Sequence, residues 1–372
     1  MKLLIVAKSI DGGTGSYIFN LLKLRKLINL KTTTLILERP TYRKIRANMI
    51  FLHNKNYYPN KYYFSYSNIL VFVKEIFWLK DIISQNKPDV VLSVNHYVNI
   101  QLSIIKYLFN KKLRLILTSH NNILTTFKNR ASYWLNIILK ILVSLLYKKA
   151  NINIGVSKNI SNDLRRYFFL DNVQTIYNGI NLKKISIKNK INKIKRIISV
   201  GRLDKQKDFF TLIKAFSILI RIFKNSELLI IGDGKIKKNL KSLISSLKLS
   251  KKIHLIGWKQ NVSQYLATTD LFLFSSNYEG FPTVILEAMS YGVPVISTNT
   301  NYGPSEILDN GRYGVLVPVG NEKAMAKAMN DLLKDGKKYN FYFKKSLERA
   351  KYFSLDKMLK NYKKIIINIF HQ

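Results

Sequence analysis

The sequence predicts an α/β protein made of two similar halves, each with a parallel sheet covered by helices. Short apolar runs of strand length alternate with amphipathic stretches of helical length, and the alternation restarts after a basic segment near the middle of the chain. Strands that alternate with helices in units of about 30 residues are typical of parallel sheets covered on both faces. The length of 372 residues suits two such domains.

In the first half, the apolar runs are predicted to be buried strands because they are short and rich in Val, Ile and Leu. These runs are Leu3–Ala7, Leu35–Leu37, Val90–Val94, Leu115–Thr118 and Ile152–Val156. Between them, Tyr17–Leu30 and Ile69–Gln85 have the apolar period of helices. We therefore expect residues 1–180 to form an N-terminal Rossmann-like domain.

The second half begins after Asn181–Arg196, a basic segment without a sustained apolar period that we interpret as a linker over residues 181–196. The pattern then restarts with a helix at Phe210–Phe223 and a new set of strands. The predicted strands are Ile197–Val200, Leu228–Ile231, Ile253–Ile256, Leu271–Phe274 and Val293–Ser297. We expect residues 197–354 to form a second Rossmann-like domain, and residues 355–372 to form a final amphipathic helix that packs back on the first domain.

The charge of the chain predicts an anionic partner. There are 62 Lys and Arg residues against 21 Asp and Glu residues, a net charge of +41. Nucleic acid, an acidic lipid surface and phosphorylated substrates are the candidates, although a coding bias toward Lys, Asn and Ile also explains part of the excess. With no cysteine, disulfides, Cys-ligated zinc and iron–sulfur sites are excluded, and the five histidines lack metal-ligand spacing.

The sequence predicts neither a signal peptide nor a spanning helix. The apolar run Leu3–Ala7 is too short for a signal peptide, and no run of about 18 apolar residues lacks a charge. We expect a cytoplasmic protein that is peripheral at the inner face of the cell membrane.

One helical segment bears on this location. Trp134–Lys148 is apolar except for a narrow polar stripe, which consists of Asn136, Lys140, Ser144 and Lys148. Such a helix is predicted either to be buried nearly all round or to lie in a membrane surface. The basic and aromatic stretch Tyr42–Tyr62 could likewise rest on anionic lipid.

A glycine-rich loop follows the first predicted strand. Residues 9–15 read SIDGGTG and open a helix. At the carboxyl edge of a parallel sheet, glycines let backbone N–H groups and a helix N-terminus approach an anion. Glycines between strand and helix are also common without a ligand, and the loop does not match the dinucleotide-binding pattern GxGxxG.

A second candidate loop opens the second half. Residues 201–208 read GRLDKQKD and place Arg202 at the end of a strand and Lys207 just before a helix. Two cations at such a turn suit a diphosphate, because a guanidinium binds in bidentate fashion and an ammonium acts as a point charge. In a chain this basic, two cations in one loop can also be coincidence.

Two acids frame a third candidate. Residues 279–287 read EGFPTVILE, and Pro282 suits the first turn of a helix, where its missing N–H would be unpaired anyway. Glu279 would then lie in the loop and Glu287 in the second turn. The amides near Phe281 and Thr283 and the helix dipole would face a phosphate, and carboxylates accept hydrogen bonds from sugar and ribose hydroxyls. The alternative is a pair of surface glutamates.

The spacing Glu279-x7-Glu287, opened by EGFP, resembles the retaining nucleotide-sugar glycosyltransferases of the GT-B fold, in the large family 4. VGRLDKQKDF resembles the arginine–lysine diphosphate motif of that family. Further second-half landmarks are IGDG at 231–234, AMSYGVPVI at 288–296 and GPSEILDNGRYGVLVP at 303–318. The resemblance is nearly continuous over residues 196–335. In the first half it is thinner: DGG at 11–13, TSHN at 118–121, GVS at 155–157 and YNGI at 177–180.

The resemblance implies two Rossmann-like domains that face each other across a cleft, with the first domain on the acceptor side. It implies that Arg202 and Lys207 hold the donor diphosphate, that Glu279 contacts hydroxyls of the donor sugar and that Glu287 binds the ribose. These roles make Arg202, Lys207 and Glu279 the expected catalytic residues. Other donor contacts would come from Gly280, Phe281, Pro282 and Thr283.

In the first half, the resemblance implies that the loop with Gly12 and Gly13 closes on the phosphate and that His120 lines the sugar pocket. The alternative for His120 is a capped histidine at the end of a strand. Residues 40–65 are expected to be an acceptor loop region, with a small third domain as the alternative.

The implied reaction is the transfer of a sugar, most simply from a UDP-sugar, to a lipid-linked or polysaccharide acceptor in the synthesis of a bacterial surface glycan such as lipopolysaccharide, O-antigen or capsule. The resemblance implies no metal or other cofactor, because cations and helix dipoles replace the metal. Since the acids are committed to substrate hydroxyls, front-face attack is favoured over a covalent carboxylate intermediate.

The implied partners are a nucleotide-sugar donor, a lipid-linked or oligosaccharide acceptor and an anionic membrane surface, and not nucleic acid. Two other functions remain as alternatives. One is a sugar epimerase of the same fold, which the Glu-x7-Glu pattern disfavours. The other is a non-enzymatic nucleic-acid-binding protein, for which the sequence shows neither a helix-turn-helix nor an RNP-like motif.

Overall fold

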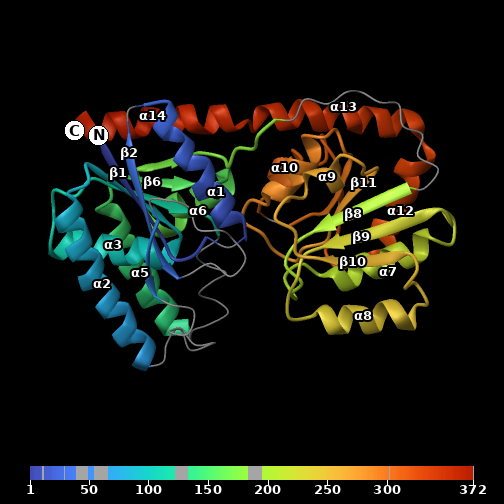
Figure 1. Cartoon of the computed structure of the whole chain (residues 1–372), viewed down its shortest axis with the longest axis horizontal. Coiled ribbons are helices and arrows are strands. Elements are labelled where there is room, and N and C mark those ends of the chain that lie inside the picture. The colour runs from blue at the N-terminus through green and yellow to red at the C-terminus, as the bar shows by residue number, and fades with distance from the viewer. Residues whose placement is uncertain are drawn as a thin grey trace. The chain divides into compact units, whose positions relative to one another are not determined.

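The computed structural model describes residues 1–10, 12–28, 30–38, 49–53, 66–121, 133–182, 195–300 and 302–371. The chain divides into two compact units, which are shown in Figure 1. Unit 1 consists of Met1–Gly179 with Asp356–Gln372, and unit 2 is Ile180–Leu355. Each unit has one parallel sheet with helices on both faces, so the predicted α/β class with two Rossmann-like domains is confirmed.

The sheet of unit 1 has seven parallel strands in the order β3-β2-β1-β4-β5-β6-β7. The strands are β1 Lys2–Ala7, β2 Lys31–Glu38, β3 Met49–His53, β4 Val90–Val94, β5 Leu115–Ser119, β6 Ile152–Gly155 and β7 Val173–Thr175. Every residue of β4 and β5 is buried, as expected for near-continuous apolar strands covered on both faces. The prediction missed β3 and β7, which are the two edge strands.

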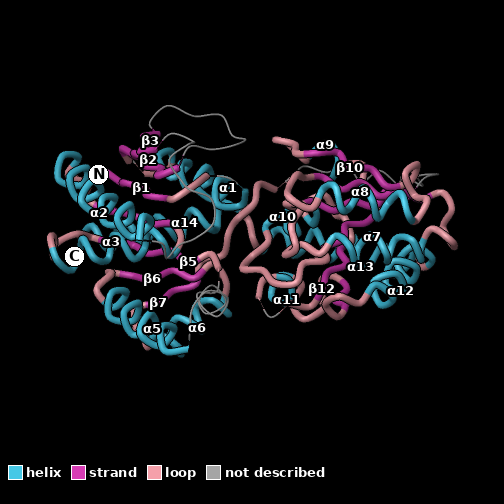
Figure 2. The backbone as a smooth tube through the Cα atoms, turned by 90° about the horizontal axis from the view of Figure 1, so that it is seen from below, coloured by secondary structure: helices cyan, strands magenta, loops and turns pink. Residues whose placement is uncertain are grey.

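Helices cover both faces of this sheet (Figures 1 and 2). They are α1 Gly12–Leu21, the 3₁₀ helix η1 Leu22–Lys26, α2 Tyr66–Asn86, α3 His96–Leu108, α5 Tyr133–Lys148, α6 Lys158–Phe168 and α14 Leu355–His371. The C-terminal helix α14 packs on the N-terminal part of unit 1. The hydroxyls of Tyr362 on α14 and Tyr17 on α1 lie 2.6 Å apart, and Lys363 donates to the carbonyl oxygen of Leu27.

The sheet of unit 2 has six parallel strands in the order β10-β9-β8-β11-β12-β13. They are β8 Lys195–Val200, β9 Ser226–Ile231, β10 Ile253–Gly257, β11 Leu271–Phe274, β12 Val295–Thr298 and β13 Val315–Val317. Strand β8 begins two residues inside the predicted linker, and residues 183–194 of that segment lie outside the described residues.

The helices of unit 2 are α7 Phe209–Leu219, α8 Lys237–Ser246, α9 Ser263–Leu266, α10 Thr283–Met289, α11 Pro304–Ile307, α12 Glu322–Lys334 and α13 Gly336–Tyr352. A core of fully buried side chains, including Phe216 on α7 and Leu273 on β11, joins helices to sheet. Each such side chain contributes about 1.5–3 kcal/mol relative to exposure. This core gives the loops at the strand ends a rigid base.

The order of the strands reverses once in each sheet. In unit 1 the chain moves outward from β1 to β3 and then returns to pair β4 with β1, and in unit 2 β11 likewise pairs with β8. Open α/β sheets bind ligands beyond the carboxyl ends of the strands at such a switch point. The loops after β1, β4, β8 and β11 are therefore the places where each unit is expected to bind.

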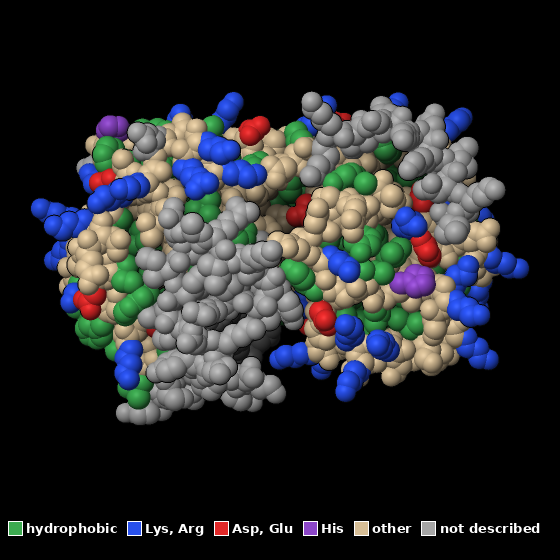
Figure 3. All heavy atoms as spheres, viewed as in Figure 1, with side chains coloured by type: hydrophobic (Ala, Val, Ile, Leu, Met, Phe, Trp, Pro, Cys, Tyr) green, Lys and Arg blue, Asp and Glu red, His purple; other side chains and the backbone are tan. Residues whose placement is uncertain are grey.

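In the part of the chain that the structure describes, no helix is both long enough and apolar enough to cross a bilayer. On the face drawn in Figure 3, Lys and Arg side chains are spread over both units rather than gathered in a single stripe.

Candidate active site

The loops after β8 and β11 meet through an ion pair between Lys207 and Glu279. The ammonium of Lys207 donates to Oε1 of Glu279, and the two side chains are only 17% and 8% exposed. The same ammonium lies 5.1 Å from the ring centroid of Phe274, the last residue of β11. The structure thus brings together two residues that the sequence singled out separately, and their burial protects the pair from screening by salt.

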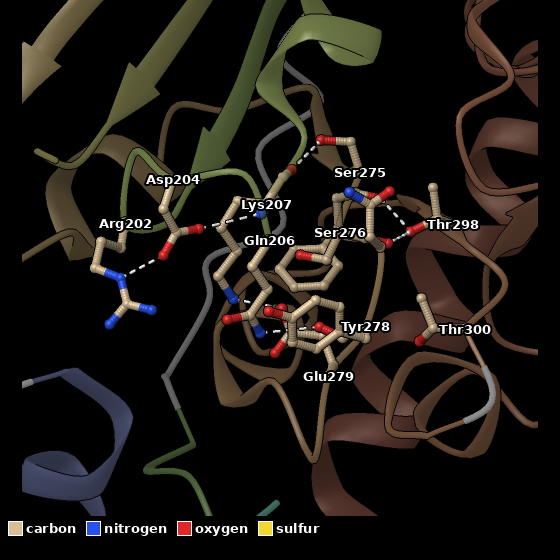
Figure 4. Close-up of polar contacts among 12 residues, drawn as sticks. Arg202, Asp204, Gln206, Lys207, Ser275, Ser276, Tyr278, Glu279, Thr298 and Thr300 are labelled. Atoms are coloured by element: carbon tan, nitrogen blue, oxygen red, sulfur yellow. Dashed lines mark hydrogen bonds and ion pairs between the residues drawn. The ribbon is translucent and has the colours of Figure 1, made fainter. Parts of the chain in front are cut away.

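Hydrogen bonds tie the two loops along their length (Figure 4). The backbone amide of Asn277 donates to the carbonyl oxygen of Gln206 at 2.8 Å, and its side-chain amide donates to the carbonyl oxygen of Lys205 at 3.0 Å. In return, the side chain of Gln206 donates to the carbonyl oxygen of Tyr278 at 2.9 Å. Ser275 donates to the carbonyl oxygen of Lys207 at 2.8 Å. The backbone around the ion pair is therefore held from both sides.

Arg202 lies in the same loop but is not part of the Lys207–Glu279 pair. Its Nε donates to Asp204, while the side chain is 70% exposed. Asp204 also accepts a 3.3 Å hydrogen bond from the backbone amide of Lys207, so it links the Arg202 guanidinium to the backbone at Lys207 (Figure 4). An exposed guanidinium with one carboxylate partner can turn toward a ligand at little energetic cost.

The glycines of the IGDG sequence allow the end of β9 to approach the same loop. A Cβ on Gly232 would stand 1.8 Å from the carbonyl oxygen of Gly201, and one on Gly234 would stand 2.3 Å from that of Leu203. In this close approach the amide of Leu203 donates to the backbone carbonyl oxygen of Asp233 at 2.9 Å. The amide of Gly234, together with Lys237, lowers the pKa of the Asp233 carboxyl.

The remaining predicted residues of unit 2 lie at the start of α10. Gly280, Phe281 and Pro282 are buried, and the ring of Phe281 packs edge-on against Phe353 at 5.5 Å. Helix α10 begins at Thr283, so Pro282 is its N-cap residue and not a member of its first turn, because its backbone is extended. Gly303 (φ +80°) packs beside this turn, where a Cβ would stand 2.5 Å from the ring of Pro282.

Thr283 and Glu287 are half-buried residues of α10. Glu287 lies one helical turn after Thr283, in the second turn of the helix as the spacing predicted. Glu279, the first acid of this stretch, is the ion-pair partner of Lys207.

In unit 1, Gly12 and Gly13 form the start of α1, and both are exposed. A Cβ on either glycine would have no heavy atom of the described residues within 4 Å. Gly12 has φ +65°, which favours glycine. Asp11, which precedes them, lies outside the described residues. The loop therefore leaves room for a ligand to approach its backbone.

His120 follows β5 and is held in a polar cluster. Thr118 donates its hydroxyl to the carbonyl oxygen of Ser93 at 2.8 Å, so it accepts from Nε2 of His120 at 3.1 Å. The ring of Tyr17 lies edge-on to the imidazole, with centroids 4.3 Å apart. Burial, followed by the nearby His96, lowers the pKa of His120 to about 3. The imidazole is therefore neutral near pH 7, and Nδ1 is left as an acceptor.

The sequence did not single out His96, which lies after β4 as His120 lies after β5. Its Nε2 donates to the carbonyl oxygen of Asn121 at 2.9 Å, and Nδ1 lies 3.3 Å from the hydroxyl of Tyr147. Burial lowers its pKa to about 4. The signal that could have found it is its position: β4 and β5 are neighbours in the sheet, and each is followed by a histidine.

No cluster of three or more His, Asp or Glu side chains that could hold a metal ion occurs among the described residues. Lys207 and Arg202 are positive groups of the candidate site of unit 2.

Two family models match the chain in succession. The model described as Glycosyltransferase Family 4 matches residues 12–184, and the model described as Glycosyl transferases group 1 matches residues 182–349. Together they extend over both units.

Three known proteins illustrate the similarity. The chain is 33% identical over 237 residues to N-acetylgalactosamine-N,N'-diacetylbacillosaminyl-diphospho-undecaprenol 4-alpha-N-acetylgalactosaminyltransferase of Campylobacter jejuni, covering 62% of this chain. The match covers 64% of that relative, somewhat less than two thirds of its length. The fold is similar to that of sucrose-phosphate synthase from Thermosynechococcus elongatus, with a TM-score of 0.83, 17% identity and all of both chains covered. It is also similar to that of HepE from Anabaena in complex with UDP-glucose, with a TM-score of 0.77, 17% identity, and 99% of this chain and 100% of that one covered.

Proposed function

The chain belongs to the family 4 glycosyltransferases of the GT-B fold, and on this premise we propose that it transfers a sugar from a UDP-sugar to a lipid-linked acceptor in bacterial surface-glycan synthesis, with retention of configuration. The observation that carries the proposal is the buried Lys207–Glu279 pair between the two loops at the switch point of unit 2. Its position, at the carboxyl ends of β8 and β11, is where α/β sheets bind nucleotides.

The two cations are proposed to bind the donor diphosphate. Lys207 is held in place by Glu279, whereas Arg202 has an exposed guanidinium that can turn onto the outer phosphate oxygens. As the bond to the sugar breaks, negative charge grows on the leaving diphosphate oxygen. Two positioned cations stabilise that charge, so the reaction is proposed to need no metal ion.

The acids are proposed to bind hydroxyls. Glu279 has a second carboxylate oxygen besides the one that accepts from Lys207, and that oxygen can accept from a hydroxyl of the donor sugar. Glu287, one helical turn into α10, is proposed to accept from the ribose hydroxyls. Gly280, Phe281 and Thr283 would supply amides, and Pro282 would shape the turn. Because both acids then hold substrate, front-face attack assisted by the leaving phosphate is the proposed route to retention.

In unit 1, the open glycine loop at Gly12 and Gly13 is proposed to approach a phosphate through its backbone. The neutral imidazole of His120 is proposed to accept a hydrogen bond from a sugar hydroxyl through Nδ1.

The acceptor part of the proposal rests on the Campylobacter relative, whose name specifies a diphospho-undecaprenol acceptor. The donor part is supported by the similar Anabaena structure, which is a complex with UDP-glucose. Since a polyprenyl acceptor stays in the bilayer, the protein is proposed to work at the cytoplasmic surface of the cell membrane.

A thermal-shift screen against UDP-, GDP-, ADP- and CMP-sugars, with and without EDTA, tests the donor site. We expect UDP-sugars alone to raise the melting temperature, equally in both conditions, and the Lys207→Met variant to lose the shift. The matched control is Lys205→Gln, which changes an exposed lysine of the same loop. A shift with another nucleotide class would refute the UDP assignment, and a shift abolished by EDTA would refute the metal-free site. Absence of any shift, together with no sugar transfer to an undecaprenyl-diphosphate-linked acceptor, would overturn the proposed function.

A further inference from the structure

Helix α5 exposes an apolar stripe to solvent. Ile138, Ile141, Leu142 and Leu145 are between 45% and 61% exposed. Their spacing of i, i+3, i+4 and i+7 places them on one face of the helix. We name these four residues the α5 stripe.

The opposite face of α5 already supplies what the fold requires. Val143, Leu146 and Tyr147 are buried. The stripe is therefore an additional apolar surface, and contiguous apolar surface of this kind marks an interaction site. The two alternatives that the sequence left open for this segment each apply to one face of the helix: the inner face is core, and the outer face is free to meet an apolar phase.

The apolar surface continues onto the neighbouring helix α6. Ser144 of α5 donates to the carbonyl oxygen of Phe168 at 2.8 Å, which holds the end of α6 beside the stripe. There, Tyr167 and Phe169 are exposed, and the ammonium of Lys140 lies 5.5 Å from the ring centroid of Tyr167. Figure 2 shows α5 and α6 side by side at the outer edge of unit 1.

The charges around the stripe identify its partner. Helix α5 carries Lys140 and Lys148 and no Asp or Glu, and the exposed Lys149 and Arg166 follow on the adjoining segments. Such long side chains can extend from an apolar surface to the level of lipid headgroups. The acids nearest in sequence are Asp163 and Asp171, fewer than these cations. A second copy of this chain would bring the same positive charge and repel the first.

We propose that the α5 stripe, with Tyr167 and Phe169, is the surface by which unit 1 docks onto an anionic bilayer. The stripe enters the boundary between headgroups and acyl chains, and the surrounding cations contact anionic headgroups. The proposal deepens the proposed function, because a lipid-linked acceptor requires the enzyme to stay at the membrane.

Flotation with lipid vesicles tests the docking surface without any substrate. We expect the full-length protein to bind vesicles of equimolar phosphatidylglycerol and phosphatidylcholine and to bind pure phosphatidylcholine weakly. The Ile141→Ser/Leu145→Ser variant should lower the partition coefficient about tenfold or more, since two apolar side chains no longer leave water. The Lys148→Gln/Arg166→Gln variant should lower it by about fivefold for each cation. High salt should remove most of the difference between the Lys148→Gln/Arg166→Gln variant and the unaltered protein, because it screens the charges. It should leave the effect of the Ile141→Ser/Leu145→Ser variant in place.

Two matched controls change exposed apolar residues elsewhere. Ile222→Ser/Val319→Ser alters unit 2, and Val73→Ser/Phe77→Ser alters α2, a second helix of unit 1 with an exposed apolar row. Both should bind vesicles like the unaltered protein. Equal melting temperatures would show that a loss of binding is not a loss of fold, and the charge variant keeps the test decisive if the serine variant unfolds.

Three results would overturn the proposal: no binding by the unaltered protein, unchanged binding by both α5-region variants, or loss of binding on altering α2 instead. A dimer that the serine variant converts to monomers, measured by light scattering, would also overturn it. Sugar transfer to a water-soluble acceptor analogue is measured separately. Activity without vesicle binding would refute the docking surface and leave the proposed function standing.

Discussion

The two units share one plan but build their candidate sites differently. In unit 2, hydrogen bonds and a buried ion pair tie the loops after β8 and β11 together. In unit 1, the glycine loop after β1 is open, since a Cβ on Gly13 would meet no heavy atom of the residues that the structure describes. A tied, charged pair of loops is organised before a ligand arrives, whereas an open loop can adjust to it.

The candidate sites of the two units also differ in charge. The site of unit 2 is built on full charges, and that of unit 1 on buried groups that stay neutral. Burial lowers the pKa of both histidines after β4 and β5 and raises that of the Tyr17 hydroxyl. Neutral acceptors suit sugar hydroxyls, and cations suit a diphosphate.

The largest expected effect comes from removing the central cation of unit 2. Lys207→Met should lower kcat/KM about a thousandfold, because in the proposed reaction the charge that develops on the diphosphate loses a fixed partner. It should also lower the free energy of unfolding, because Glu279 becomes a nearly buried charge without a cation. The double variant Lys207→Met/Glu279→Gln should recover stability but not activity. Steady-state kinetics and urea denaturation measure the two effects, and recovery of activity in the double variant would contradict the role of Lys207.

Substitutions of Glu279 and Glu287 should affect different kinetic parameters, kcat for the first and donor KM for the second. Glu279→Gln should lower kcat about a hundredfold with a smaller change in donor KM, since its proposed contact with the sugar would strengthen in the transition state. Glu287→Ala should mainly raise the donor KM, because a ribose contact is equal in both states. Initial rates over a range of donor concentrations give both parameters. Equal changes of kcat and KM in both variants would contradict this division.

Replacing one glycine in each unit by alanine should show which of the two loops is more tightly packed. Gly232→Ala should lower the free energy of unfolding by about 3 kcal/mol, because its Cβ would collide with the backbone of Gly201. Gly13→Ala, in the open loop of unit 1, should change it by no more than about 0.5 kcal/mol. Urea denaturation followed by circular dichroism measures both. Similar losses would mean that the two loops are equally constrained.

A separate expected effect is the pH dependence of the stability of unit 1. The pKa values of His120 and His96, about 3 and 4, lie below the ordinary value of 6.5, so the unfolded chain takes up protons first as the pH falls. The stability contributed by the neutral rings is complete above about pH 6.5 and is lost as the pH falls toward 4. Each ring should contribute a slope of about 1 kcal/mol per pH unit. His120→Asn should remove about half of this contribution, and an unchanged slope in that variant would refute it.

The central strands could be predicted from the sequence because strands buried on both faces consist of continuous apolar residues. The run Val90–Val94 is apolar throughout, and every residue of β4 is buried. The edge strands β3, β7 and β13 were missed. Strands β7 and β13 have only three residues each, too few for a recognisable apolar run, and β3 lies in a segment that the sequence analysis interpreted as an acceptor loop region. The predicted residues Lys207 and Glu279 do lie together. Their ion pair and the hydrogen bonds of Gln206 and Asn277 join two loops that are some 70 residues apart in the sequence. No local sequence pattern reveals such contacts.

Local periodicity, glycine placement and motif spacing were enough to establish the α/β class, the two Rossmann-like units and the family, because each depends on residues close together in the chain. Contacts between distant segments decided the rest. They paired Lys207 with Glu279, placed His96 near His120, and buried one face of α5 while leaving Ile141 and Leu145 exposed. The physical reason is that burial and electrostatic pairing depend on which segments pack together, and only the folded chain determines that.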